Sequence, residues 1–183
     1  MAPTIGVDIG GTKVAGGVVD DNGEILAEER RDTPATDADG VVETIVAVID
    51  TLRSKHEVEA VGLAAPGFVD EGRALVRIAP NIPGWRDRPL KADVEQATGL
   101  RAVVENDANA AAWAEAVHGA GRGHDHQVCV TIGTGVGGGI IAGGELYRGR
   151  FGNAAEVGHM KVLADGRPCG CGQRGCWEQY ASG

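Results

Sequence analysis

An apolar strand that runs into a glycine turn and then into a second apolar strand occurs twice in this 183-residue chain. The first copy covers residues 4–19 around Gly10-Gly11-Thr12-Lys13, and the second covers residues 128–142 around Gly133-Thr134-Gly135. Short strands joined by such turns form antiparallel hairpins. Because the same plan recurs, we expect two related domains, each built on one strand-turn-strand unit.

The segment between the two copies alternates strands with helices. Asp21-Asn22-Gly23 predicts a tight turn that makes residues 4–31 a three-stranded antiparallel meander. Apolar residues at helical spacing predict an amphipathic helix over residues 41–52, with Asp37 or Asp39 near its N-cap. Residues 58–65 form a run that is apolar except for Glu59, which is typical of a strand buried on both faces. The fold class is therefore α/β.

Two further helices and one linker complete this reading of the chain. Pro89 opens a helix that stops at Gly99, and a strand over residues 101–105 precedes an alanine-rich helix over residues 108–118. Residues 119–126 contain glycine, histidine and arginine without large apolar residues, as expected of a linker. We therefore place an N-terminal domain at residues 1–119 and the beginning of a second domain at residues 120–183.

Both glycine turns have the equipment to hold a phosphate. A turn such as Gly10-Gly11-Thr12 exposes backbone N–H groups and a hydroxyl, and Asp8 at the preceding strand end could orient Mg²⁺ or its waters. Glycine pairs also join many hairpins that bind nothing, so this signal alone is weak. Neither turn matches the dinucleotide-binding fingerprint or a P-loop, which disfavours a Rossmann dehydrogenase.

One histidine and three cysteines lie close together near the end of the chain. Cys169, Cys171 and Cys176 have the spacing C-x-C-x4-C, and His159 precedes them. Four such ligands suit a closed tetrahedral Zn²⁺ site of structural type. A disulfide and three unrelated buried thiols are the alternatives, but Cys169 and Cys171 are too close for an easy disulfide.

Asp107 lies where a strand gives way to a helix. The residue types satisfy a simple structural role, because either Asn106 or Asp107 could cap the helix. A carboxylate at the carboxyl end of a sheet is also where open α/β folds place ligands. A helix N-terminus favours the ionised form that a proton acceptor needs. The two roles are compatible.

Composition restricts the class of partner. The net charge of −9 repels phosphate backbones, so we expect no nucleic-acid partner. Thirty glycines without a collagen period indicate loops that approach a small ligand closely. No apolar run approaches about 18 residues, and no leader segment is evident, so we expect no membrane partner and a cytoplasmic protein.

Five segments together resemble the ROK family of sugar kinases, in particular the bacterial ATP-dependent glucokinases. They are DIGGTK at 8–13, END at 105–107, GTGVGGG at 133–139, EVGH at 156–159 and CGCGQRGCWE at 169–178. The resemblance implies an actin-like (ribonuclease H-like) fold of two α/β domains around a cleft. It implies a glucokinase that uses ATP, Mg²⁺ and structural Zn²⁺, and a homo-oligomer.

The resemblance also assigns roles to single residues. Asp107 would be the catalytic base, and zinc would be held by His159, Cys169, Cys171 and Cys176. The sugar would be bound by Gly67, Asn81, Asn106, Asp107, Glu156, His159 and Glu178. The nucleotide phosphates would be bound by Asp8, Gly10, Gly11, Thr12, Lys13, Gly133, Thr134 and Gly135.

The family implies more chain than the 183 residues provide. Its members run on past the cysteine cluster, so we expect a fragment that is inactive alone and that leaves Val128, Val130, Ile132, Ile140 and Ile141 partly exposed. A family repressor is disfavoured, because only seven residues precede DIGGTK. The open alternatives are another hexose (mannose, N-acetylhexosamine or fructose) as acceptor, polyphosphate as donor, and a sugar sensor without catalysis.

Overall fold

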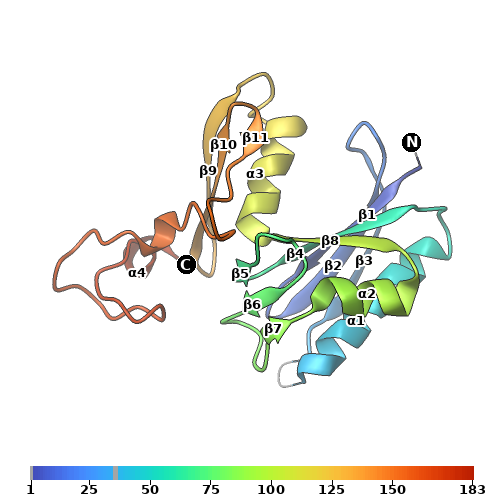
Figure 1. The fold of residues 1–183 in the computed structure, drawn as a ribbon, viewed down its shortest axis with the longest axis horizontal. Coiled ribbons are helices and arrows are strands. Elements are labelled where there is room, and N and C mark those ends of the chain that lie inside the picture. The colour runs from blue at the N-terminus through green and yellow to red at the C-terminus, as the bar shows by residue number, and fades with distance from the viewer. Residues whose placement is uncertain (1, 35–36) are drawn as a thin grey trace. The chain divides into compact units, whose positions relative to one another are not determined.

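The computed structural model describes residues 2–34 and 37–183, and it has a mixed α/β fold (Figure 1). The chain divides into two compact units, Met1–Asp107 and Ala108–Gly183. Each unit contains one of the two strand-turn-strand copies, so the predicted α/β class is confirmed. The domain division that the linker predicts, after residue 119, stays a prediction.

The first unit is built on a five-stranded sheet with the order β3-β2-β1-β4-β8. Its strands are β1 (Thr4–Ile9), β2 (Lys13–Val19), β3 (Ile25–Asp32), β4 (Ala60–Ala65) and β8 (Arg101–Asn106). Strands β1, β2 and β3 pair antiparallel, which confirms the predicted meander. Strands β4 and β8 continue the sheet parallel to β1. The carboxyl ends of β1, β4 and β8 therefore meet at one edge.

Helices α1 (Ala38–Arg53) and α2 (Leu90–Thr98) pack against each other and against this sheet (Figure 1). Asp37 caps α1 by accepting hydrogen bonds from the N–H groups of Asp39 and Gly40, and Gly99 ends α2 at a φ of 72°. The apolar face of α1 covers β1 and β2, and Ile45, Val48 and Ile49 are fully buried. This packing fixes the strands whose ends carry the candidate site.

A small antiparallel sheet follows β4. It consists of β5 (Phe68–Val69), β6 (Val76–Ile78) and β7 (Arg86–Arg88). The loop between β6 and β7 is held by Trp85, which is buried and donates from its indole N–H to the Ala38 carbonyl oxygen. Sequence left open whether this loop lines a pocket or packs; in the structure its tryptophan packs in the core.

The second unit has a three-stranded antiparallel sheet with the order β11-β10-β9. Its elements are β9 (His126–Ile132), β10 (Val136–Ala142), β11 (Glu145–Leu146), the short helix η1 (Val157–His159) and α4 (Glu178–Ala181). Helix α3 (Asp107–Val117) packs on β10 (Figure 1). A Cβ at Gly139 would lie 2.4 Å from the Ala112 Cβ, so only glycine allows this approach.

The expected exposure of the second sheet is confirmed for most positions. Val128, Val130 and Ile132 are 63%, 38% and 63% exposed, and Ile140 is partly exposed. The prediction was wrong for Ile141, which is 3% exposed. Its side chain belongs to a small core with Ala112 of α3 and Leu146, since α3 covers that face of β10.

No helix in the described ranges 2–34 and 37–183 is long and apolar enough to cross a membrane.

Candidate functional site

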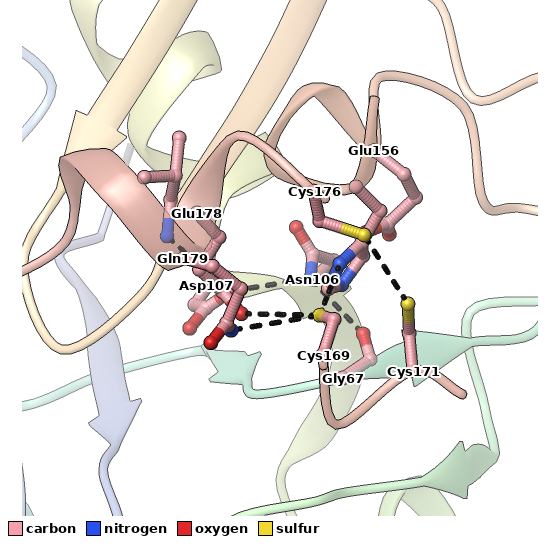
Figure 2. Close-up of polar contacts among 11 residues, drawn as sticks. Gly67, Asn106, Asp107, Glu156, Cys169, Cys171, Cys176, Glu178 and Gln179 are labelled. Atoms are coloured by element: carbon pink, nitrogen blue, oxygen red, sulfur yellow. Dashed lines mark hydrogen bonds and ion pairs between the residues drawn. The ribbon is translucent and has the colours of Figure 1, made fainter. Parts of the chain in front are cut away.

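The candidate base lies at the carboxyl edge of the first sheet. Strand β8 ends at Asn106, and α3 begins at Asp107, whose side chain is exposed. The Asn106 side-chain amide donates to the Gly67 carbonyl oxygen at 3.0 Å and to Oδ1 of Asp107 at 3.1 Å (Figure 2). One amide therefore joins three of the residues that the sequence assigns to the sugar.

Gly67 is required where it lies. Its φ is 86°, in the left-handed region, and a Cβ there would be 2.1 Å from the Ile78 carbonyl oxygen. The close approach brings the end of β6 beside the loop that follows β4. Gly67 has no side chain beside its carbonyl oxygen, and this oxygen accepts the hydrogen bond from the Asn106 side-chain amide.

The first glycine turn lies in the same unit and contacts Asn81. A Cβ on Gly11 would lie 3.0 Å from the Asn81 carbonyl oxygen. The N–H of Gly10 donates to the Lys13 carbonyl oxygen at 2.9 Å, and the Thr33 hydroxyl donates to the Gly10 carbonyl oxygen at 2.7 Å. The turn is thus closed by its own main chain and tied to the segment after β3.

Asp8 lies on the exposed face of β1, one residue before the strand ends at Ile9. The surrounding protein raises the pKa of the Asp8 carboxyl above its ordinary 3.8 through partial burial. Because the side chain keeps an exposed surface, we expect it to be ionised at neutral pH and able to face a cation.

The second glycine turn is closed in a similar way and is joined to Glu178. The Gly133 N–H donates to the Gly135 carbonyl oxygen at 2.9 Å, and the Val136 N–H donates to Oε2 of Glu178 at 3.1 Å. A Cβ on Gly135 would lie 2.6 Å from the same carboxylate oxygen. Glycine at this position therefore lets the carboxylate lie against the turn.

The four predicted metal ligands converge. One ligand atom from each of His159, Cys169, Cys171 and Cys176 can be chosen so that all four lie within 4.8 Å of one another. Nδ1 of His159 is 3.6 Å from the Cys169 sulfur. The sulfurs of Cys171 and Cys176 are 3.7 Å apart (Figure 2).

These distances fit a tetrahedral zinc ion. Zn–S bonds of about 2.3 Å and Zn–N bonds of about 2.1 Å separate two sulfurs by about 3.8 Å and sulfur from nitrogen by about 3.6 Å. The donor set also suits zinc, because thiolates and imidazole are its preferred ligands. All four cysteines of the chain are free thiols in the structure, which agrees with metal binding and not with a disulfide.

Protonation opposes metal uptake at one ligand. Burial, together with hydrogen bonds in which the Cys176 thiol is the donor to Cys171 and Cys169, raises the pKa of this thiol to about 12 when no metal is bound. Since zinc binds the thiolate, metal binding at this cysteine releases a proton.

Two carboxylates flank the cysteine cluster. Oε1 of Glu178 is 3.9 Å from the Cys169 sulfur, and Oε2 of Glu156 is 4.0 Å from Nε2 of His159. His159 therefore directs Nδ1 to the cysteines and Nε2 toward Glu156. Glu178 bridges the cluster and the second glycine turn, which links the two features within one unit.

Sequence reasoning missed three contacts of this site. Val136 and Gln179 were not singled out, yet the Val136 N–H binds Glu178 and the Gln179 amide lies 3.6 Å from the Cys169 sulfur. Arg73 was also missed, although it forms an ion pair with Glu105 beside the candidate base. Only Gln179 carried a signal, because it adjoins the cysteine cluster.

Comparison with known proteins assigns the family. The sequence profile of the ROK family matches residues 4–183. The chain belongs to the ROK family. A glucokinase from Streptomyces coelicolor is 55% identical over 183 residues, which are 100% of this chain and 57% of that protein. A glucokinase from Thermotoga maritima is 43% identical over 179 residues, which are 97% of this chain and 56% of that protein.

A solved structure supports the same grouping. The ROK family glucokinase from Streptomyces griseus, crystallised with glucose and AMPPNP, superposes with a TM-score of 0.92 at 60% identity. The match covers 98% of this chain and 57% of that one. This ROK family chain therefore spans a little over half the length of the relatives it matches, and the activity of the whole protein is a matter for proposal.

Proposed function

We propose that this chain carries the sugar site of a glucokinase, which transfers the γ-phosphate of ATP to the 6-hydroxyl of glucose. The observation that carries the proposal is the exposed Asp107 carboxylate at the end of β8, held by the Asn106 amide, which also binds the Gly67 carbonyl group. The ROK glucokinases at 55% and 60% identity support it.

Asp107 would act as the general base. Phosphoryl transfer needs little covalent work from the protein and depends on positioning and on charge neutralisation. As the sugar oxygen forms a bond to the γ-phosphorus, its proton passes to the Asp107 carboxylate. The bond between the γ-phosphorus and the β,γ-bridging oxygen breaks, and ADP leaves with that electron pair on the bridging oxygen. The hydrogen bond from Asn106 to Oδ1 orients the carboxylate that accepts the proton.

The sugar hydroxyls would be recognised by groups from both units. In the first unit these are Asn106, Asp107, Gly67 and Asn81, and in the second they are Glu156, His159 and Glu178. A sugar that lacks the hydroxyl group to which a carboxylate hydrogen-bonds should bind weakly, since an unpaired charge in a closed site is costly. This provides the selectivity among hexoses.

The nucleotide phosphates would lie at the two glycine turns. Because the Gly10 and Gly133 N–H groups close their own turns, a phosphate would take its donors from Gly11, Thr12, Thr134 and Gly135. Lys13 follows the first turn and would add a positive charge. Mg²⁺ accompanies ATP and neutralises charge on the phosphate oxygens, and Asp8 is the residue we expect to face its water shell.

Zinc would have a structural role. His159, Cys169, Cys171 and Cys176 leave no coordination position open, so the ion would hold the loop that carries Glu156 and Glu178. Reduced thiols used as metal ligands support a reducing compartment such as the cytoplasm. A cleft between two actin-like domains and a homo-oligomeric state are the remaining parts of the proposal.

The test is ADP formation by the native full-length protein with a panel of sugars. We expect glucose to give a higher kcat/KM than mannose, fructose or N-acetylglucosamine. With glucose as the acceptor, we expect ATP to give a higher rate of glucose phosphorylation than polyphosphate. Turnover of another hexose in preference to glucose would assign a different ROK kinase. Tight glucose binding without ADP formation would identify a sugar sensor and overturn the proposal.

A further inference from the structure

Arg73 links the small β5-β6-β7 sheet of the first unit to β8, the strand that precedes the candidate base. It lies in the turn between β5 and β6, which is close to β8 (Figure 1). Its Nε is 3.2 Å from Oε2 of Glu105, and its carbonyl oxygen accepts a hydrogen bond from the Val104 N–H at 3.1 Å. Main chain and side chain of one residue thus both bind β8.

Glu105 transmits this contact to the site. It is 9% exposed, and its other oxygen, Oε1, accepts a hydrogen bond from the Asn106 N–H at 3.1 Å. A buried carboxylate is costly unless it is paired and hydrogen-bonded. The Arg73 guanidinium supplies a positive charge to one oxygen, and the strand end supplies a donor to the other, so the side chain bridges Arg73 and Asn106.

The turn that presents Arg73 is itself well held. The Asp70 carboxylate accepts hydrogen bonds from the N–H groups of Ala74 and Leu75 at 2.8 and 2.7 Å. The Arg73 N–H donates to the Asp70 carbonyl oxygen at 3.0 Å, and Arg73 has a φ of 54°. Few residues other than glycine adopt this left-handed conformation, which is unfavourable for an arginine. Here it directs the guanidinium at Glu105.

We infer that Arg73 is a positioning residue of the sugar site. Through Glu105 it fixes the main chain at Asn106, and Asn106 then orients the Asp107 carboxylate and the Gly67 carbonyl group. The inference rests on the proposed role of Asp107 as the base. A displacement of about 1 Å at a reacting group can lower kcat about 10²-fold, so a residue that touches no substrate can control the rate.

The variant Arg73→Gly tests this in the native full-length protein. Glycine adopts a φ of 54° without strain, so the guanidinium is removed while the turn is retained. We expect kcat to fall about 10-fold or more, with KM for glucose little changed. The melting temperature should fall as well, because the buried Glu105 carboxylate loses its charged partner. Arg73→Lys keeps a charge near Glu105 and should recover part of the loss.

The matched control is Arg77→Gln. Arg77 lies in β6 and forms an ion pair with Asp87 in which both side chains are more than half exposed. Such a pair contributes little, so kcat should equal that of the unchanged protein. A second check is the double variant Arg73→Gly with Glu105→Gln. If Arg73 acts through Glu105, the kcat of the double variant should be no lower than the kcat of Glu105→Gln alone.

A readout without catalysis separates this inference from the proposed function. The NMR resonances of the Asn106 side-chain amide should move in Arg73→Gly and stay in place in Arg77→Gln. Normal kcat in Asp107→Asn would refute the proposed base, and the amide resonances would still decide whether Arg73 positions Asn106. An unmoved amide, normal kcat in Arg73→Gly, or losses that multiply in the double variant would overturn the inference.

Discussion

Asp70 shows how one carboxylate can hold a turn that matters elsewhere. Partial burial acts to raise the pKa of Asp70, but hydrogen bonds from the N–H groups of Leu75, Ala74 and Gly72, with the charge of Arg77, lower it below 3.8. A lowered folded-state pKa means that the ionised side chain stabilises the fold. That contribution is present above the unfolded pKa of about 3.9 and is lost as pH falls through the folded pKa.

We therefore predict that Asp70→Asn lowers the free energy of unfolding by about 1 kcal/mol at pH 7. The difference from the unchanged protein should shrink below about pH 4, where the carboxylate protonates. Urea unfolding at pH 7, 5 and 3 measures both. Asp20 is a suitable comparison site, because it is a partly exposed residue in the turn before β3 whose pKa is also lowered, chiefly by a hydrogen bond from the Glu24 N–H. A difference that stays constant with pH would refute the role of charge.

Single residues were predictable where the contact is local in sequence. Asp37 caps α1 as its position suggests, and Gly99 ends α2 in the left-handed conformation that glycine favours. In contrast, the ion pair of Arg73 with Glu105 joins residues that lie 32 positions apart in the sequence. No periodicity or motif records such a pairing, because it depends on how β5 and β6 fold beside β8.

At the scale of elements, the cluster of His159, Cys169, Cys171 and Cys176 was the most predictable part of the site. The spacing of Cys169, Cys171 and Cys176 limits the geometry to one that a single ion can satisfy, and the structure brings these sulfurs together with His159. The bridge from Glu178 to Val136 was not predictable, since it requires α4 to lie against the turn before β10. The loop and the turn are therefore more closely coupled than their sequences indicate.

This coupling predicts the behaviour of Cys171→Ala. The native protein should contain one zinc per chain, and the variant should lose both zinc and affinity for glucose, because the loop carries Glu156 and Glu178. Cys129→Ala should keep the metal, since Cys129 lies in β9 outside the cluster. Metal analysis and glucose titration give the two values. Loss of zinc with unchanged glucose affinity would contradict this coupling and would mean that the ion stabilises the loop without affecting the sugar site.

Zinc uptake should also depend on pH. Without metal the Cys176 thiol has a pKa of about 12, so protons compete with zinc for this ligand. We predict that zinc affinity falls as pH is lowered from 8 to 6, as measured by competition with a chelator. Equal affinity across this range would mean that the thiols are already ionised before the metal binds.

At the scale of the whole molecule, the second sheet presents an apolar face. Val128, Val130 and Ile132 alternate along β9 and are all exposed, whereas Ile141 on the neighbouring strand is buried beneath α3. The apolar run before the glycine turn predicted the strand, but it could not tell which face of the sheet a helix would cover. That distinction depends on the glycines of β10, which admit α3 at close range.

The exposed face predicts how the 183-residue chain behaves alone. Soluble monomers rarely tolerate a contiguous apolar patch, so we expect this chain to self-associate. Replacing both Val128 and Ile132 by threonine should reduce association without loss of stability, because threonine suits a strand. Ile141→Thr should instead destabilise the fold by about 2 kcal/mol. Sedimentation and thermal unfolding distinguish these outcomes, and a chain that stays monomeric would contradict the first.

The most direct test of the proposed kinase measures Asp107→Asn in the native full-length protein. Asparagine keeps the size of the side chain and removes the proton acceptor. We predict that glucose affinity stays within about 3-fold while kcat for ADP formation falls about 10²-fold or more. Near-normal kcat in this variant would contradict the role of Asp107 as the base and would leave it as the residue that begins α3.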